Sequence, residues 1–363
     1  MKNIKSFFAI FLFVSIIFLI SSCGSKSPTT AKEDVRTGTE GISMNFLPNN
    51  PPDKIHADNA GTNNFDVILE IRNKGAYPQP EDLVANSLGG PAGKIYLSGY
   101  DPYIMELTPK SGFSAAGTDL NKLALDGKST INPSGGQDLL AFQGRIPDYG
   151  KLTTDIYNIN LLATVCYQYQ TVVGPTVCID PDPFTTISQK KVCAVNGITL
   201  SSQGAPIAIT RIDEEAFDQR TQFKITFKNV GGGDVIKKES LPKCDPYGKG
   251  ESASATSLSS NKIERDDLDK VYLDYVKIAD RPITCGPFID GTVKGSSGLV
   301  RMINGEGFII CELQKSKGEY SQTNTAYTTP MVMKLSYGYR TTIQRTLQVI
   351  REPPSTGSTT SSP

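Results

Sequence analysis

The chain has 363 residues, and its 37 Lys and Arg residues balance its 37 Asp and Glu residues. This length accommodates two domains of ordinary size. A balanced charge provides no net field to attract nucleic acid or an anionic surface, so it argues against a nucleic-acid-binding protein. The 33 Gly and 23 Pro residues, with 20% charged residues, are typical of a globular, loop-rich β protein.

The N-terminus carries the features of an export signal. A basic start at residues 1–5 precedes an apolar run at residues 7–20. This run matches the core of a signal peptide and is shorter than the roughly 20 residues that a spanning helix needs. The sequence Leu-Ile-Ser-Ser-Cys at residues 19–23 resembles a bacterial-type lipobox, which implies a lipid on Cys23. We therefore expect a lipoprotein signal peptide at 1–22 and a flexible tether at 23–40.

Two stretches, residues 65–75 and 221–231, organise the rest of the chain. In each, alternate positions are apolar, as in a strand with one buried face, and each ends in an Asn-x-Gly turn. The two stretches match at an offset of 156 positions, and Gly41 and Ile42 match Gly197 and Ile198 at the same offset. The predicted inward residues are Val67, Leu69, Ile71, Phe223, Ile225 and Phe227.

Later segments also match between the two halves. Residues 94–97 match 270–273 at an offset of 176, so the second half carries an insertion, which includes Cys244 and the Ser-rich stretch 251–261. Residues 262–269 are compatible with a helical turn. Residues 161–171 match 331–341 at an offset of 170, and we interpret each as the first arm of a hairpin. The predicted inward residues of these arms and their return strands are Leu161, Ala163, Val165, Tyr167, Tyr169, Val177, Ile179, Met331, Met333, Leu335, Tyr337, Tyr339, Leu347 and Val349.

These patterns predict an all-β protein with two tandem immunoglobulin-like antiparallel sandwiches. The first domain is expected at 41–179 and the second, with its insertion, at 192–351. Residues 180–191, which contain a Pro-Asp-Pro sequence at 181–183, form the linker. The Ser/Thr-rich tail at 352–363 is expected to be disordered.

The strand followed by Asn-x-Gly resembles a segment that recurs in CARDB-type and related immunoglobulin-like domains of prokaryotic surface proteins. Asn73 with Gly75, and Asn229 with Gly231, carry this resemblance. It implies immunoglobulin-like sandwiches that serve as spacers or binding modules, with no catalytic residues to transfer. The cysteines and the insertion of the second half depart from a plain domain of that kind.

Six cysteines remain after Cys23, and an even number in an exported chain indicates disulfides. Cys166 and Cys178 lie on the two arms of the predicted hairpin, and their counterparts Ser336 and Gln348 are both polar. We therefore predict a Cys166–Cys178 disulfide.

The four other cysteines, all in the second half, allow three pairings. We favour Cys244 with Cys285, which would fix the insertion, and consequently Cys193 with Cys311. A four-cysteine zinc site is the alternative, but the chain contains no Cys-x-x-Cys sequence.

Candidate catalytic and metal-binding patterns are weak. The lone histidine, His56, lies in a predicted loop at 48–64 without a nucleophile motif. The acidic clusters at 213–218 and 264–269 do not fit a calcium loop and are interpreted as solvated. The glycines at 231–233 are interpreted as turn formers, and Tyr167, Tyr169, Tyr337 and Tyr339 as core residues rather than a sugar-stacking surface. No cofactor, metal site or catalytic residue is expected.

The sequence thus favours an exported lipoprotein that faces the cell exterior or the periplasm. Its expected role is binding, adhesion or scaffolding, with the membrane as one partner and a protein or glycan as another. Two alternatives stay open. One is a secreted hydrolase or lyase that uses carboxylates, which a deep acidic cleft would favour. The other is a structural part of a surface layer, which exposed edge strands would favour.

Overall fold

Strands dominate the fold. The computed structural model describes residues 35–352 except 59, 84–86, 111, 186–190, 248–261 and 316–324. Within these residues the chain consists of strands, short 3₁₀ turns and loops, and the strands form several antiparallel sheets. The predicted all-β class is confirmed. No helix in the described part is both long and apolar enough to span a membrane.

The first half of the chain, residues 35–179, contains nine strands and three 3₁₀ turns. The strands are β1 (Ile42–Phe46), β2 (Lys54–Ala57), β3 (Asn64–Asn73), β4 (Gly93–Ser98), β5 (Glu106–Pro109), β6 (Thr118–Asp119), β7 (Gln137–Arg145), β8 (Ile156–Val173) and β9 (Thr176–Ile179). The turns are η1 (Pro80–Asp82), η2 (Leu120–Lys122) and η3 (Tyr149–Lys151).

The second half, residues 192–352, follows with the remaining elements. Its strands are β10 (Ile198–Thr199), β11 (Ile207–Ala216), β12 (Arg220–Asn229), β13 (Asp234–Ile236), β14 (Lys270–Ile278), β15 (Arg281–Pro282), β16 (Thr284–Gly286), β17 (Gly298–Arg301), β18 (Glu306–Gln314) and β19 (Tyr327–Arg351). Its described 3₁₀ turns are η5 (Lys238–Cys244) and η6 (Arg265–Asp267), and η6 lies within residues 262–269, whose sequence is compatible with a helical turn.

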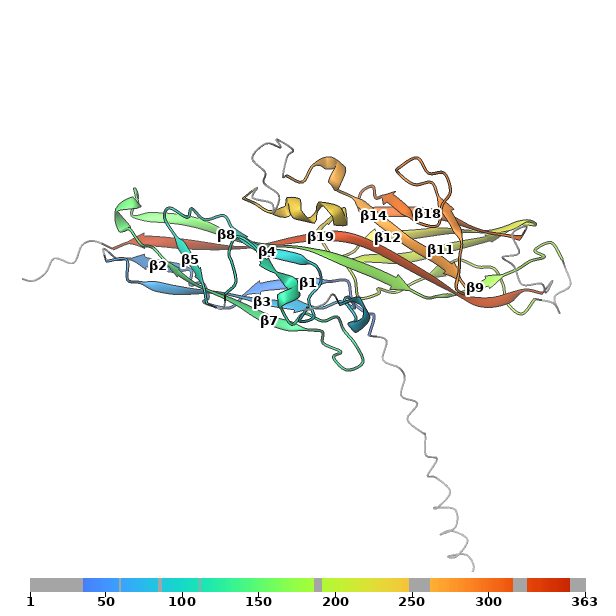
Figure 1. Ribbon diagram of the computed structural model, residues 1–363, viewed down its shortest axis with the longest axis horizontal. Helices are drawn as coiled ribbons and strands as arrows, with labels where there is room; N and C mark the ends of the chain where they lie inside the picture. Colours follow the sequence, from blue (N-terminus) through green and yellow to red (C-terminus); the bar gives the residue numbers. More distant parts are fainter. Residues whose placement is uncertain are drawn as a thin grey trace, which may run out of the picture. The chain divides into compact units, whose positions relative to one another are not determined.

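A ten-stranded sheet contains strands from both halves, with β8 and β19 side by side at its centre (Figure 1). A four-stranded sheet, ordered β1-β3-β7-β5, and a five-stranded sheet, ordered β10-β11-β12-β18-β16, contribute their apolar faces to the same core. The arrangement is therefore consistent with sandwich packing. All of these strands belong to one compact unit that begins at Val35, so strands on either side of the predicted 180–191 linker share a sheet.

The register of β8 against β19 shows how the two halves meet. The pairing extends from Ile156 opposite Ile350 to Val173 opposite Met333. Gln168 faces Gly338, its own counterpart at the offset of 170. This offset therefore relates the two strands by an approximate two-fold axis through that residue pair.

The predicted hairpins are wrong. β9 does not fold back on β8, because it pairs with β19 in the same register, with Ile179 opposite Tyr327 and Thr176 opposite Pro330. In the second half β19 is a single strand of 25 residues without a return arm. A Gly-Pro sequence at 174–175 indicated a turn. In the structure β8 and β9 run along β19 on one straight path, and this sequence only separates the two strands. The inward residues were nevertheless predicted correctly. The alternation of buried and exposed side chains depends on the local period of the strand and not on whether a turn follows it.

The tyrosines at the centre of this sheet are core residues, as predicted. Tyr167, Tyr169, Tyr337 and Tyr339 are at most 1% exposed. Neighbouring rings pack edge to face or tilted, with centroids 5.6 Å apart for Tyr167 and Tyr169 and 5.9 Å apart for Tyr167 and Tyr339. The two halves thus share an aromatic centre across the β8–β19 ladder.

In the first half, the Asn-x-Gly turn is bonded to this aromatic centre. The Asn73 side-chain carbonyl accepts hydrogen bonds from the Tyr169 hydroxyl at 3.1 Å and from the Gly75 amide at 3.1 Å. Its amide group donates to the Tyr77 carbonyl at 2.7 Å, and the Tyr77 amide donates to the Tyr169 hydroxyl at 3.3 Å. A Cβ atom at Gly75 would collide with that hydroxyl, which explains the glycine.

The same contacts recur in the second half. The Asn229 side-chain carbonyl accepts from the Tyr339 hydroxyl at 2.8 Å and from the Gly231 amide at 3.3 Å. Its amide group donates to the Gly233 carbonyl at 2.7 Å, and the Gly233 amide donates to the Tyr339 hydroxyl at 2.7 Å. Residues matched at the offsets of 156 and 170 therefore occupy matching hydrogen-bond positions.

The predicted match of the first strands is wrong. Ile42 pairs with Asn73, but the residue that pairs with Asn229 is Ile207 and not Ile198. The Ile42 amide donates to the Tyr167 hydroxyl, and the Ile207 amide donates to the Tyr337 hydroxyl. β11 is thus the counterpart of β1. The Gly-Ile dipeptide at 197–198 has the same residues as Gly41-Ile42 but not the same structural position.

Candidate functional site

A cavity of about 490 Å³ lies where the two halves of the chain meet, and we call it the seam cavity. One wall comes from the first half, from β4, β6 and η2, and the opposite wall is the η5 segment of the second half. Its lining residues are Ala92, Gly93, Lys94, Tyr96, Ala116, Asp119, Asn121, Cys166, Lys238, Glu239, Leu241, Pro242 and Asp245.

The floor of the seam cavity is the outer face of the ten-stranded sheet. Ile95 and Leu97 of β4 point into the main core, so Lys94 and Tyr96 point to the other face. A second apolar cluster forms on that face, where η5 and residues 263–268 cover the sheet. Its members are Tyr96, Cys166, Ile236 and Cys244, with Leu241, Ile263 and Leu268 packed against them.

A disulfide between Cys166 and Cys244 joins β8 to the end of η5 across the two halves. Three residues further on, the Tyr247 hydroxyl donates a 2.6 Å hydrogen bond to the Leu97 carbonyl of β4. Burial raises the pKa of Tyr247 above its ordinary value, so this hydroxyl keeps its proton at neutral pH. The segment is therefore attached to the first half at two points.

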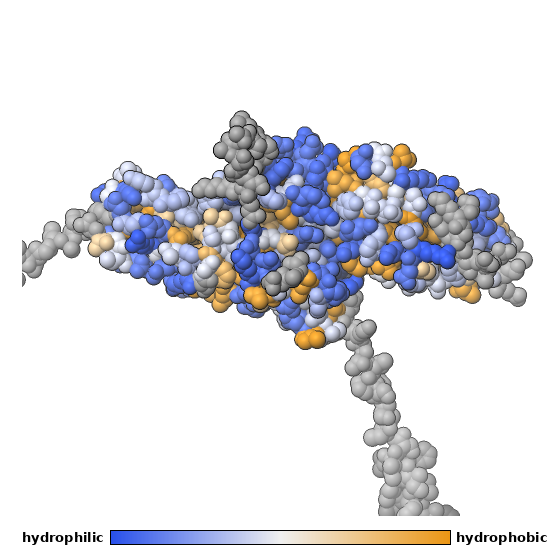
Figure 2. Space-filling model, viewed as in Figure 1, coloured by the Kyte–Doolittle hydropathy of each residue, from blue (hydrophilic) through white to orange (hydrophobic). Residues whose placement is uncertain are grey.

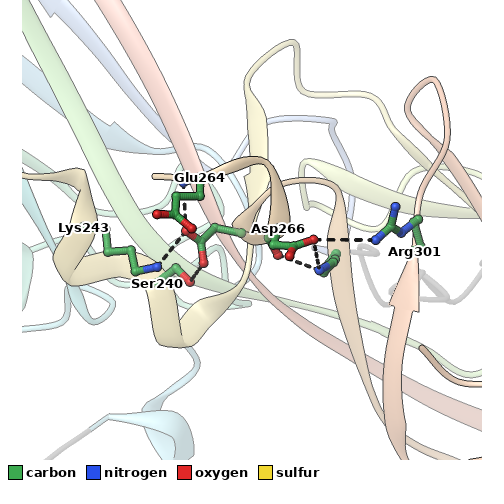
Figure 3. A network of polar contacts seen from close by, with 7 residues as sticks. Ser240, Lys243, Glu264, Asp266 and Arg301 are labelled. Atoms are coloured by element: carbon green, nitrogen blue, oxygen red, sulfur yellow. Dashed lines mark hydrogen bonds and ion pairs between the residues drawn. The ribbon is translucent and has the colours of Figure 1, made fainter. Parts of the chain in front are cut away.

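The other side of η5 is held by a polar network (Figure 3). Asp267 accepts hydrogen bonds from the Ser240 hydroxyl at 2.7 Å, the Lys243 ammonium at 2.8 Å and the Glu264 amide at 2.9 Å. Burial opposes ionisation of Asp267, but the hydrogen bonds together outweigh it and lower its pKa to about 2. The bond to Asp267 is also the main cause that raises the pKa of Lys243. This charged pair fixes the cavity wall to η6.

The charges around the seam cavity have both signs. Lys94 lies 3.7 Å from Asp119, which also pairs with Lys122 at 3.0 Å. The Lys238 ammonium donates to the Ser336 hydroxyl at 3.4 Å and lies 4.7 Å from the centroid of the Tyr272 ring. Residues of both charges thus contribute to the lining, but the Lys238 ammonium itself is directed to Ser336 and Tyr272, which do not line the cavity.

One polar atom of the cavity lining stands out. The side-chain carbonyl oxygen of Asn121 is buried and has no hydrogen-bond partner within the described part of the chain. An unpaired buried acceptor costs free energy comparable to the loss of a hydrogen bond. Because solvent does not reach this oxygen, a molecule in the seam cavity does not reach it either.

All six cysteines predicted to form disulfides do so, but the predicted partners are wrong. Cys166 and Cys178 are twelve residues apart on a straight path, about 40 Å at about 3.3 Å per residue, so they cannot meet. Cys178 instead pairs with Cys193 and closes a short loop of 15 residues over the predicted linker.

The two predicted pairs in the second half are wrong as well. Cys285 of β16 lies directly opposite Cys311 of β18, and these two residues are bonded. Cys244 is unavailable to Cys285 because η5 carries it to the outer face of β8. The sequence assigned partners within each half, whereas one bridge joins the halves and another spans the linker.

The other candidate residues do not converge on a site. Cys23 lies outside the described residues. His56 is in β2 rather than in a loop, where it is 53% exposed and lies 3.1 Å from a carboxylate oxygen of Glu352. Among the described residues, no group of three or more His, Cys, Asp or Glu side chains has metal-binding geometry.

The acidic clusters divide into separate roles. Asp213 pairs with Arg211 at 2.6 Å, whereas Asp267 belongs to the η5 network. Glu214 is partly buried, and one of its oxygens accepts a 3.3 Å hydrogen bond from the Cys178 amide. Burial raises the pKa of Glu214 to about 7. These carboxylates therefore serve local structure, and Glu214 is sensitive to pH.

A second, apolar hollow of about 580 Å³ lies beside β17 and β18. Ile303 and Phe308, which line it, are 70% and 53% exposed. Figure 2 shows hydrophobic surface over the part of the molecule that carries β14 and β18. Its apolar character separates this hollow from the charged seam cavity.

The sequence did not identify the seam cavity. It identified residues 94–97 as a segment that matches 270–273, but this match does not indicate that another segment covers the outer face of the strand. One signal was present: Cys166 points outward from β8, and an outward cysteine without a partner on its own sheet requires a covering segment.

A search against protein-family models gives no match to this chain, and a search of curated proteins gives none either. The resemblance to CARDB-type domains stays a prediction from the sequence.

Proposed function

We propose that this protein is a lipid-anchored binding protein outside the cytoplasm and that its ligand occupies the seam cavity. The observation that carries the proposal is the cavity itself, whose opposite walls belong to different halves of the chain and are joined by the Cys166–Cys244 disulfide. A binding site needs walls that keep their spacing, and this covalent link provides it.

The location is supported by the cysteines. Three disulfides indicate an oxidising compartment outside the cytoplasm. The lipobox-like sequence ending at Cys23 supports attachment to a membrane. We therefore place the mature protein on the outer side of a membrane, with the tether between the lipid and the folded unit.

The two halves are proposed to be copies of one immunoglobulin-like unit. The repeated Asn–Tyr hydrogen bonds and the approximate two-fold register of β8 and β19 support a duplication. Among the described residues of the first half, only the three-residue turn η1 lies between the Asn-x-Gly turn and β4, so η5 has no counterpart there. Duplication would supply the scaffold, and the insertion would supply the binding site.

Membrane attachment is tested by cell fractionation and by the intact mass of the mature protein. Wild-type protein should sediment with membranes and carry an acyl mass on Cys23. Cys23→Ser should release the protein from the membrane fraction or leave its signal peptide uncleaved, whereas Ser25→Ala should behave as wild type. An unmodified Cys23 in membrane-free wild-type protein would contradict the anchor.

The binding function is tested by a ligand screen on the mature lipidated protein in detergent, with thermal stability as the readout. The panel contains neutral sugars, uronic acids, polyamines and short peptides. At least one class should raise the melting temperature of the wild type. Ala116→Trp, which fills the cavity, should abolish that shift, whereas Ala194→Trp, at an exposed loop position, should preserve it. A panel without any shift would overturn the binding function.

A further inference from the structure

We propose that the Cys178–Cys193 disulfide is a thiol–disulfide exchange site for the dithiol of a partner protein, and that Glu214 donates the proton for its opening. This inference goes beyond the proposed binding function and does not depend on the seam cavity. It rests on the exposure of this bridge, on the position of Glu214 beside Cys178, and on an oxygen of Glu214 that has no hydrogen-bond partner.

The three disulfides differ in their access to solvent. The Cys166–Cys244 and Cys285–Cys311 bridges are buried, and none of their four cysteines is more than 7% exposed. Cys193 is partly exposed and lies between two exposed neighbours. Exchange requires that a thiolate reach one sulfur of the bridge. Cys193 is therefore the bonded cysteine that an external thiolate reaches most easily without unfolding of the chain.

Glu214 is a carboxyl group on the core-facing side of β11. Its neighbour across the ladder with β12 is Phe223, which is fully buried. One carboxyl oxygen accepts a 3.3 Å hydrogen bond from the Cys178 amide, and the other is buried without a partner among the described residues. The local structure thus uses only one of the two oxygens.

The charged residues around Glu214 are engaged elsewhere. On β11, on β12 and in the linker beside β9 they form pairs with other groups: Asp213 with Arg211, Arg220 with Glu312, and Asp180 with Lys191. Burial raises the pKa of Glu214 to about 7, and the Cys178 amide opposes this increase. The carboxyl group can therefore hold a proton at neutral pH and release it there.

The contact with the Cys178 amide places this proton close to the disulfide. The Cys178 sulfur is three bonds from its own amide nitrogen, so it lies within about 7 Å of the carboxyl group. Once the bridge is broken, rotation about the Cα–Cβ bond of Cys178 brings the sulfur closer. The donor and the acceptor both belong to the protein, so the transfer does not require that solvent reach the buried oxygen.

The exchange takes place in two steps. A thiolate of the partner attacks the Cys193 sulfur, the Cys178–Cys193 bond breaks, and the electron pair leaves on the Cys178 sulfur. Because Cys178 is only 6% exposed, its thiolate is poorly solvated, and the Glu214 proton neutralises it. The second thiolate of the partner then attacks the mixed disulfide and releases Cys193, which takes a proton from solvent. The partner dithiol is oxidised to a disulfide by two electrons, the bridge is reduced to two thiols, and Glu214 regains a proton from solvent.

The first test measures reduction of the mature protein by dithiothreitol under native conditions. New thiols are alkylated at timed intervals and identified by mass spectrometry. Cys178–Cys193 should open first, while the two buried bridges stay closed and show that the fold is intact. The rate constant divided by the thiolate concentration should fall about tenfold or more as the pH rises through about 7, because Glu214 loses its proton there.

The second test uses Glu214→Gln, which removes the proton donor at similar size. Its normalised rate should not depend on pH, and at about pH 5.5 it should be about tenfold or more below that of wild type. Glu215→Gln, at the exposed next position of β11, should follow wild type. A purely structural effect of Glu214→Gln would change the rate by the same factor at every pH.

A monothiol identifies the sulfur that is attacked. Glutathione should form a mixed disulfide on Cys193, and the released Cys178 should be alkylated. A glutathione adduct on Cys178 instead would contradict the proposed direction of attack.

The outcomes are independent of the ligand screen at the seam cavity. Earlier opening of a buried bridge, or opening of all three bridges together, would overturn the exchange site. Parallel pH profiles of wild type and Glu214→Gln would overturn the role of Glu214 and the inference with it. The wild-type profile decides the question even if Glu214→Gln does not fold, because a normalised rate that is constant around pH 7 would refute proton donation.

Discussion

Individual hydroxyl groups connect the two halves of this protein to its core. Tyr167 and Tyr337 are fully buried, and each hydroxyl accepts a hydrogen bond from the first amide of a strand. Burial raises the pKa of both groups, so they stay protonated. The sequence predicted their burial from alternation. It did not reveal their backbone partners, which come from segments more than 100 positions away.

Tyr337→Phe should destabilise the protein more than Tyr167→Phe does. Each variant leaves a buried amide unpaired, at a cost of about 1–3 kcal/mol. Tyr337 additionally loses its 2.9 Å hydrogen bond with the Thr171 hydroxyl. Urea unfolding measures both effects, and Tyr157→Phe, at a half-buried position of β8, is the control. Equal stability of wild type and either variant would refute the role of these hydroxyls.

Glu214 should make stability depend on pH. Its pKa is about 7 in the folded protein, against an ordinary value of 4.5, because burial disfavours the charged form. Between these values the unfolded chain releases a proton that the folded protein retains, so folding stability decreases as the pH rises from about 4.5 to about 7. Above about pH 7 the loss of folding stability is complete and no longer changes with pH.

Glu214→Gln should remove this loss. At pH 8 the variant is expected to be more stable than wild type by about 1–2 kcal/mol, after allowance for partial solvent access. At pH 4 the two should differ little, since the wild-type carboxyl is then protonated in both states. Glu215→Gln, at an exposed neighbouring position, is the control. A difference between wild type and Glu214→Gln that is the same at both pH values would contradict the assignment.

At the scale of elements, η5 determines the site. Alternation predicted most strands of the main core, because a period of two is visible within a few residues. It could not predict that η5 covers the outer face of β4 and β8, since this contact depends on a segment far away in the chain. The straight continuation of β8 into β9 was missed for a similar reason: the partner that keeps it straight, β19, lies in the other half.

Asp267→Asn should weaken the attachment of η5 to η6. The variant loses the charge that pairs with Lys243, and we expect a stability loss of about 2 kcal/mol at neutral pH. Because the pKa of Asp267 is lowered to about 2, its contribution is present above its ordinary pKa of 3.8 and disappears as the pH falls toward about 2. The difference between wild type and variant should therefore shrink over that window.

Urea unfolding at pH 7 and at pH 2 to 3 measures this effect. Asp218→Asn, at an exposed position in the loop between β11 and β12, is the control. A loss for Asp267→Asn that is as large near pH 2 as at pH 7 would show that the carboxylate does not stabilise η5 through its charge.

At the scale of the whole molecule, the β8–β19 ladder and the Cys166–Cys244 disulfide both join the halves. The sequence predicted the class, the inward faces and the offsets that relate the halves. It gave no information on cysteine partners, because spacing in sequence does not report distance in a sheet. In a chain-entropy picture, a link over 78 residues destabilises the unfolded chain by about 4.5 kcal/mol, the largest effect among the three bridges.

Disulfide mapping of the unreduced mature protein tests this account most directly. Proteolysis and mass spectrometry should yield one peptide pair that joins Cys166 to Cys244, together with pairs for Cys178 with Cys193 and Cys285 with Cys311. Such a result would show that a segment of the second half is attached to the sheet of the first. A peptide that joins Cys166 to Cys178, or free thiols at Cys166 and Cys244, would contradict the account.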